Sequence, residues 1–137
     1  MRYLGIDFGE KRIGIAVCDD ADGICLPLTT LSRSSDGSAI QDILHIGHEQ
    51  EVVGFVIGDP VLLDGTIGSA AKRVRSFAAK LESEGGLPVH RIGETLTSRE
   101  AEERLRAGGA SRKLQRQSVD AVAAQILLQD WIDMERP

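Results

Sequence analysis

The fold is decided by residues 3–17, which read Tyr3-Leu4-Gly5-Ile6-Asp7-Phe8-Gly9-Glu10-Lys11-Arg12-Ile13-Gly14-Ile15-Ala16-Val17. Two apolar stretches flank a charged turn that contains a glycine, and this pattern predicts a β-hairpin. Successive side chains of a strand point to opposite faces, so each predicted strand has one large apolar face and one face of small residues. Asp7 belongs to the small-residue face. We expect a helix or a phosphate backbone to approach there; the alternative is a plain hairpin in which the acid stands by chance.

Composition limits the function classes. The chain has 137 residues, and we expect residues 1–137 to form a single domain around one core. The net charge of −5 argues against a general attraction to nucleic acids or anionic membranes, so any nucleic-acid contact has to be local. Cys18 and Cys25 are too few for a disulfide framework, and we expect reduced thiols. Without a signal-like start or a bilayer-spanning segment, the sequence predicts a cytoplasmic protein that does not bind membranes.

Strand and helix patterns alternate along the rest of the chain. In order, they predict a strand over 24–28, a helix over 40–48, a strand over 52–58, a helix from Ala70 to Gly85, a strand over 87–92, a short helix from Thr97 and a closing helix over about 118–131. Pro27 places the first of these strands at an edge. Because three consecutive strands precede alternating helices and strands, we expect an α/β fold with ribonuclease H-like topology. Its mixed sheet has five strands, the first three antiparallel, with helices on both faces.

Three acids are expected at one edge of this sheet. Asp7 lies near the carboxyl end of the first strand, Glu94 follows the fifth, and Asp120 is expected in the first turn of the closing helix. Ligands of open α/β sheets bind at the carboxyl ends of parallel strands, so these acids converge if the first and fifth strands are parallel. Taken singly, each acid has an equally good structural explanation; Asp120, for example, would favour the positive end of its helix. The hypothesis depends on their joint placement.

Clustered carboxylates point to a metal site. They repel one another and stay ionised together only around a cation. Magnesium and manganese prefer oxygen ligands, and a pair of such ions supports phosphodiester hydrolysis. The histidines, His45, His48 and His90, are scattered, which argues against zinc. We therefore expect Mg2+ or Mn2+ as cofactor, as two ions bound together with substrate.

Basic residues form two groups beside these acids. Lys11 and Arg12 flank the hairpin turn next to Asp7. The second group surrounds the loop that leads to Asp120 and consists of Arg104, Arg106, Arg112, Lys113 and Arg116. Both groups are candidates for phosphate binding, although for the second group simple exposure to water is an equally good explanation.

Three motifs in order resemble the YqgF family, the Holliday-junction-resolvase-like proteins of the ribonuclease H-like superfamily. They are residues 5–16, residues 56–60 followed by Asp64-Gly65, and residues 118–129. The resemblance spans essentially the whole chain and implies a metal-dependent nuclease that processes precursor 16S rRNA in ribosome biogenesis. It also implies Asp7, Glu94 and Asp120 as catalytic and metal-binding acids. The expected partners are precursor rRNA first, branched DNA second, and ribosomal particles, with the protein a monomer or a homodimer.

The chain departs from the family pattern at two places. Gly93-Glu94-Thr95 stands where Asp-Glu-Arg is usual, so the acid remains while an arginine that could hold phosphate is lost. Asp59 stands where an apolar residue is usual, and it either adds charge near the site or caps a turn. Two alternatives stay open: a Holliday-junction resolvase, and a nucleic-acid-binding or assembly factor without catalysis. A nucleotide-binding kinase lobe is disfavoured, because 137 residues cannot supply a second large domain.

Overall fold

The computed structural model describes residues 1–60, 68–93 and 112–135, with side chains in the last segment from Val119 onward. One five-stranded sheet has the strand order β3-β2-β1-β4-β5. Its strands are β1 (Arg2–Phe8), β2 (Arg12–Asp19), β3 (Ile24–Ser32), β4 (Val52–Asp59) and β5 (Val89–Gly93). The pairs β1–β2 and β2–β3 are antiparallel, whereas β1–β4 and β4–β5 are parallel. The predicted mixed sheet is confirmed, and the first and fifth strands run in the same direction.

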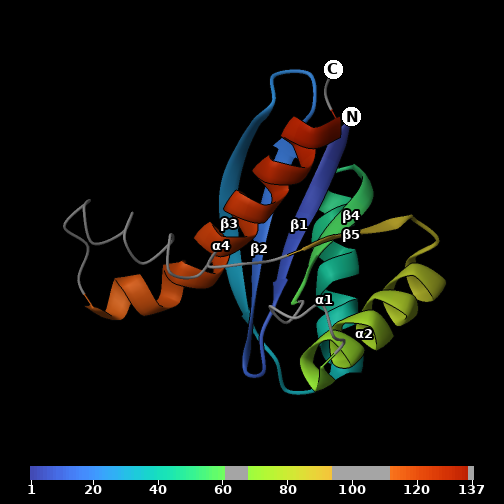
Figure 1. Ribbon diagram of the computed structural model, residues 1–137, viewed down its shortest axis with the longest axis vertical. Coiled ribbons are helices and arrows are strands. Elements are labelled where there is room, and N and C mark those ends of the chain that lie inside the picture. The colour runs from blue at the N-terminus through green and yellow to red at the C-terminus, as the bar shows by residue number, and fades with distance from the viewer. Residues whose placement is uncertain (61–67, 94–111, 136–137) are drawn as a thin grey trace.

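Helices cover both faces of the sheet, as predicted (Figure 1). The helices α1 (Asp36–Glu49) and α2 (Ser69–Gly85) pack on one face, and α4 (Arg112–Glu135) packs on the other. The core between the sheet and the first two helices is large and apolar; it includes Leu4, Ile6, Ile13, Ile15, Ile40, Ile43, Phe55, Ile57, Val74, Phe77 and Leu81. None of the helices in the described ranges is long and apolar enough to cross a membrane.

Local signals explain most element boundaries. The α1 helix begins earlier than its apolar pattern, because the Ser35 side chain accepts a hydrogen bond from the backbone N–H of Ser38 and caps the helix. The α2 helix is capped at its carboxyl end by Gly86, whose backbone has the left-handed conformation that glycine adopts readily. The apolar pattern predicts a helix start at Ala70, but Ala70 is exposed and the buried stripe of α2 begins with Ala71. The predicted edge strand is confirmed and extends to Ser32. The predicted helix from Thr97 lies outside the described residues.

The closing helix corrects one prediction. Because α4 begins at Arg112, Asp120 is its ninth residue and lies more than two turns from the helix start. The prediction of Asp120 in the first turn is therefore wrong, and the helix dipole no longer explains this acid, since its effect fades within one turn. The apolar pattern predicts a start of this helix near residue 118 because only the part from there onward packs on the sheet.

Candidate active site

The small-residue face of the hairpin receives α4, as predicted. A Cβ at Gly5 would lie 2.8 Å from Cβ of Leu128 and 2.9 Å from the carbonyl oxygen of Ala124. A Cβ at Gly14 would overlap the carbonyl group of Asp120. Only residues without a side chain allow this approach, so the two glycines set the distance between the helix and the sheet.

This packing brings Asp7 and Asp120 to the same place. Asp7 on β1 is the cross-strand partner of Gly14 on β2, and directly opposite residues share a face of the sheet. Gly14 in turn lies against the backbone of Asp120. Asp7 is only 8% exposed, and the Asp120 side chain is 16% exposed. Both carboxylates thus have little access to water on the same side of the sheet, a costly arrangement unless cations or donors compensate it.

Arg12 is one such donor. Its Nε donates a 2.8 Å hydrogen bond to Oδ2 of Asp120, while about half of the Arg12 side chain stays exposed. The turn that carries Arg12 is closed by a 2.9 Å hydrogen bond from the N–H of Gly9 to the carbonyl oxygen of Arg12. Arg12 was predicted to hold phosphate, and the structure places it between solvent and the acids. Lys11, beside it in the turn, is exposed.

Sequence reasoning missed the residue that holds this turn. The guanidinium of Arg33 donates a 2.9 Å hydrogen bond to the carbonyl oxygen of Glu10, forms a 2.8 Å ion pair with Asp36, and lies 4.6 Å from the centroid of the Phe8 ring. Arg33 therefore fixes the loop on which Lys11 and Arg12 stand. The hydrogen bond from Arg33 to Glu10 joins the residue after β3 to the first hairpin. No local sequence pattern predicts such a contact.

The other predicted site residues are placed only in part. Glu94 lies outside the described residues, but the preceding Gly93 pairs with Asp59, so β5 ends at the same edge of the sheet as β1 and β4. Arg112, Lys113 and Arg116 form the first turns of α4, and their side chains are outside the described part, as are Arg104 and Arg106. Within residues 1–60, 68–93 and 112–135, no group of three or more His, Cys, Asp or Glu side chains could hold a metal ion. Glu94 as a third acid of the site therefore stays a prediction.

The residues present fit a divalent cation with oxygen ligands. Asp7 and Asp120 offer carboxylate oxygens with low exposure to solvent, and such hard ligands suit magnesium or manganese. The histidines offer no competing site, because His45 and His48 are exposed on α1 while His90 packs against Trp131, with ring centroids 4.8 Å apart.

Asp59 does not belong to this pair. Along β4, Phe55 and Ile57 face α1 and α2, and the alternation places Asp59 on that same face, opposite to Asp7. Its Oδ2 accepts a 3.1 Å hydrogen bond from Nη2 of Arg75 and forms a 3.5 Å ion pair with Nη1 of Arg91. Asp59 is thus the buried partner of two arginines, a role that neither of the two sequence interpretations anticipated.

The sheet order and the helices on both faces define an α/β fold of the ribonuclease H-like class. Residues 1–134 match the family model described as RuvX: Holliday junction resolvase, so the chain belongs to this family, as the resemblance to YqgF proteins predicted. A protein of Anaeromyxobacter sp. (strain K), named "Putative pre-16S rRNA nuclease", is 42% identical over 137 residues and covers 100% of both chains. A protein of the same name from Syntrophus aciditrophicus is 43% identical over 133 residues, covering 97% of this chain and 89% of its own.

The similarity extends to a solved structure of the same fold. The chain superposes on Thermus thermophilus RuvC, determined in complex with a Holliday junction substrate, with a TM-score of 0.62 and 17% sequence identity. The match covers 98% of this chain and 96% of RuvC. At this identity the likeness supports the fold, and it agrees with the topology predicted from the order of strands and helices.

Proposed function

We propose that this protein is a divalent-metal-dependent nuclease that processes precursor 16S rRNA. The observation that supports the proposal is the position of Gly14, which pairs with Asp7 across the hairpin and lies against the backbone of Asp120. Asp7, Asp120 and Glu94 would hold one or two Mg2+ or Mn2+ ions. When bound, such ions activate the attacking water and stabilise the leaving oxygen of a phosphodiester. The names carried by the relatives favour precursor rRNA as the substrate.

The chain's own residues perform the remaining tasks. Asp7 and Asp120 would hold the cations that bind the reacting phosphate, and the low exposure of the two carboxylates limits competition from bulk water. Arg12 uses Nε toward Asp120, and a guanidinium has further N–H donors with which to hold a phosphate oxygen. Arg33 keeps Arg12 and Lys11 at the edge of the site. The hairpin turn therefore supplies contacts to the substrate, and Asp7 of β1 together with Asp120 of α4 supplies the reactive centre.

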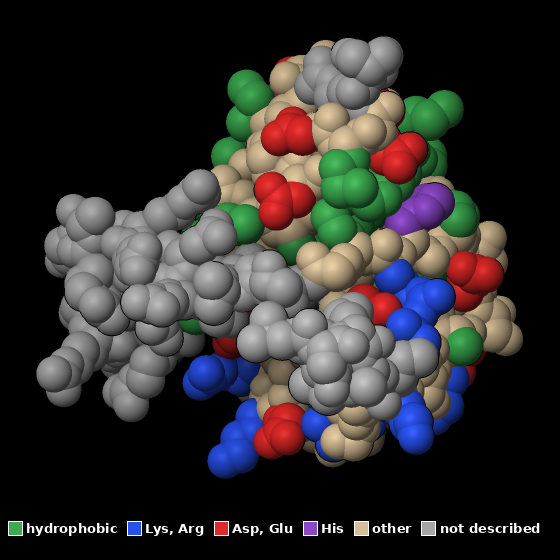
Figure 2. All heavy atoms as spheres, viewed as in Figure 1, with side chains coloured by type: hydrophobic (Ala, Val, Ile, Leu, Met, Phe, Trp, Pro, Cys, Tyr) green, Lys and Arg blue, Asp and Glu red, His purple; other side chains and the backbone are tan. Residues whose placement is uncertain are grey.

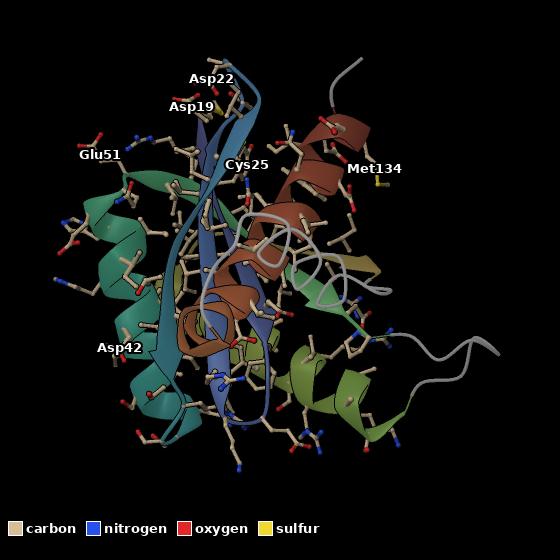
Figure 3. The ribbon with its side chains drawn as sticks, turned by 90° about the vertical axis from the view of Figure 1, so that its left-hand side faces the viewer. Asp19, Asp22, Cys25, Asp42, Glu51 and Met134 are labelled. Atoms are coloured by element: carbon tan, nitrogen blue, oxygen red, sulfur yellow. The ribbon has the colours of Figure 1, made fainter. Side chains whose placement is uncertain are left out.

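The charge distribution supports binding of nucleic acid at one end of the molecule. Figure 2 shows Lys and Arg side chains mainly in the lower half of the view, toward the carboxyl end of β1, with hydrophobic side chains above. The opposite end carries Asp19, Asp20 and Asp22 in and beside the β2–β3 turn (Figure 3). This polarity reconciles a net charge of −5 with local binding of a polyanion. The function implies ribosomal particles as partners and the cytoplasm as the compartment.

A cleavage assay tests the proposal. A precursor 16S rRNA fragment and a four-way DNA junction are incubated with the native protein, Asp7→Asn and the control Asp42→Asn, in magnesium, manganese or chelator. Asp42 is exposed on α1 and leaves the site unchanged. We expect metal-dependent cleavage of the RNA that Asp7→Asn abolishes and Asp42→Asn retains. Cutting of the junction alone would identify a resolvase, binding without cutting would identify an assembly factor, and undiminished cutting by Asp7→Asn would reveal a contaminating nuclease.

A further inference from the structure

Asp59 binds two arginines through a single oxygen. Arg75 and Arg91 both contact Oδ2, at 3.1 and 3.5 Å, and Asp59 is only 6% exposed. Among the described residues, Oδ1 of Asp59 and Nε of Arg75 are buried and have no hydrogen-bond partner. A complete arginine–carboxylate pair would join both nitrogens of the fork to both oxygens. In the described part of the chain, the cluster therefore sets two positive charges against one negative charge.

Both arginines line a hollow on the surface. It has a volume of about 360 Å3 and lies between α2 and the edge strand β5; its lining consists of Arg75, Ala78, Ala79, Glu82, Val89 and Arg91. The four α2 residues have the spacing of one helix face. The side chains of Arg75 and Arg91 are 37% and 45% exposed, so their guanidinium groups are accessible as well as anchored.

The hollow is basic at one end only. Glu82 lies seven residues after Arg75, about 10 Å along the helix, which is close to a Debye length at physiological salt. Its carboxylate accepts a 2.9 Å hydrogen bond from the backbone N–H of Val89 and thereby fixes the start of β5. An anion would therefore bind at the end with Arg75 and Arg91, away from Glu82.

The end of the hollow that contains Arg75 and Arg91 lies near the carboxyl ends of the parallel strands, as do Asp7 and Asp120. Ile57 of β4 pairs with Ile6, which precedes Asp7, and Asp59 follows two residues later. Asp59 also pairs with Gly93, the residue before Glu94. The arginines and the acids thus flank the strand ends from opposite faces of the sheet. A polynucleotide held at the acids would have to pass the ends of β4 and β5 to reach the hollow.

We propose that Arg75 and Arg91, positioned by Asp59, bind a backbone phosphate of the nucleic-acid substrate outside the cleavage site. The inference rests on the proposed function, because it assigns a second contact to the same substrate. A planar guanidinium presents paired N–H donors that match phosphate oxygens, and an anchored guanidinium loses little freedom on binding. The buried carboxylate below the two arginines holds them close to each other despite their mutual repulsion.

Binding of a short fluorescein-labelled single-stranded RNA tests this site. The measurement uses the Asp7→Asn background to prevent cleavage and follows fluorescence anisotropy over a range of salt concentrations. We expect Arg75→Gln and Arg91→Gln each to raise the Kd about three- to tenfold and to lower the slope of log K against log salt by about 0.7. Lys80→Gln is the matched control, because Lys80 is an exposed cation on α2 outside the hollow. It should change neither quantity.

The outcomes separate this inference from the proposed function. An unchanged Kd and salt slope in both glutamine variants, with cleavage intact in otherwise native protein, would overturn the phosphate site alone and leave the cluster a structural ion pair. Failure of every protein to bind RNA would overturn both. If a glutamine variant does not fold, Arg75→Lys and Arg91→Lys preserve the charge. We expect them to keep the salt slope and lose affinity, since lysine cannot make the forked contact, and equal affinity would contradict the site.

Discussion

Gly14 on β2 lies directly against the backbone of Asp120 on α4, with no room for a side chain between them. The same glycine pairs across the hairpin with Asp7. One residue without a side chain therefore controls the position of both acids. The catalytic geometry that we propose therefore depends on this packing contact.

Replacing Gly14 by alanine should separate this helix from the sheet. The added Cβ would overlap the Asp120 carbonyl, and backbone cannot move aside as a flexible side chain can. We expect Gly14→Ala to lower the free energy of unfolding by about 3 kcal/mol or more and to abolish cleavage. Urea unfolding followed by circular dichroism measures the first effect. In the control Gly37→Ala, the Cβ meets nothing within 4 Å and stands in a helix, so stability should rise by up to about 1 kcal/mol. Equal losses in both variants would contradict the packing argument.

The ion pair between Arg12 and Asp120 should oppose metal binding. A fixed positive charge next to a ligand carboxylate disfavours a second cation. We expect Arg12→Gln to raise the affinity for Mn2+ about three- to tenfold in calorimetric titration, while the KM for RNA increases. Because Arg12 is half exposed, stability should change by less than about 1 kcal/mol. Arg2→Gln is the control, since Arg2 donates to the Gln50 carbonyl and lies at the far end of β1. A lower Mn2+ affinity in Arg12→Gln would refute this account.

The Asp59 cluster should contribute to stability as well as to binding. Asp59→Asn keeps the size of the side chain but removes the negative charge that holds Arg75 and Arg91 together. We expect the free energy of unfolding to fall by about 1–3 kcal/mol, less than for a fully buried pair because both arginines are partly exposed. The exposed Asp42→Asn should change it by no more than about 0.5 kcal/mol. Thermal melts of the two variants would show the difference, and matching melting temperatures would argue against the cluster.

Cys25 should make stability depend on alkaline pH. Burial raises the pKa of the Cys25 thiol far above its ordinary value near 9, and hydrogen bonding with Cys18, its cross-strand neighbour, adds to the shift. In the unfolded chain the thiol ionises at its ordinary pKa, whereas the folded protein keeps it neutral. The buried neutral thiol therefore contributes fully to the free energy of unfolding below about pH 9. Above that pH its contribution falls by about 1.4 kcal/mol per pH unit. The stability difference between native protein and Cys25→Ala should shrink with this slope, and a difference that stays constant with pH would exclude the effect.

The fold could be predicted because its signals are local. The alternation of small and large residues from Gly5 to Ala16 predicts the hairpin and a close approach to its small-residue face, by a helix or a phosphate backbone, and the structure shows the helix there. Pro27 predicts the edge strand. The start of α4 could not be predicted from apolar periodicity, because the stretch before Ser118 is mostly polar. An apolar pattern predicts which part of a helix packs against the sheet, but it does not predict where the helix begins.

The candidate site, like the fold, could be predicted only in part. Asp7 could be singled out because an acid interrupts a strand of apolar and small residues, and its meeting with Asp120 follows once the small-residue face is known to receive the helix. The roles of Arg33 and Asp59 could not be predicted, because each depends on contacts between segments far apart in the chain. The pairing of Asp59 with Arg91 needs the register of β4 against β5, which no local spacing encodes.

Paramagnetic broadening by Mn2+ in 1H–15N spectra tests the central claim most directly, because it locates the cation without any assumption about substrate. Surface acids at the other end of the sheet serve as an internal reference for unspecific binding: Asp19 and Asp20 contact the amino terminus, and Asp22 lies in the same turn (Figure 3). We expect substoichiometric Mn2+ to broaden the amide signals of Gly14 and Ala121 first, and Asp7→Asn to remove this effect. Broadening confined to the β2–β3 turn, or unaffected by Asp7→Asn, would contradict a metal site at Asp7 and Asp120.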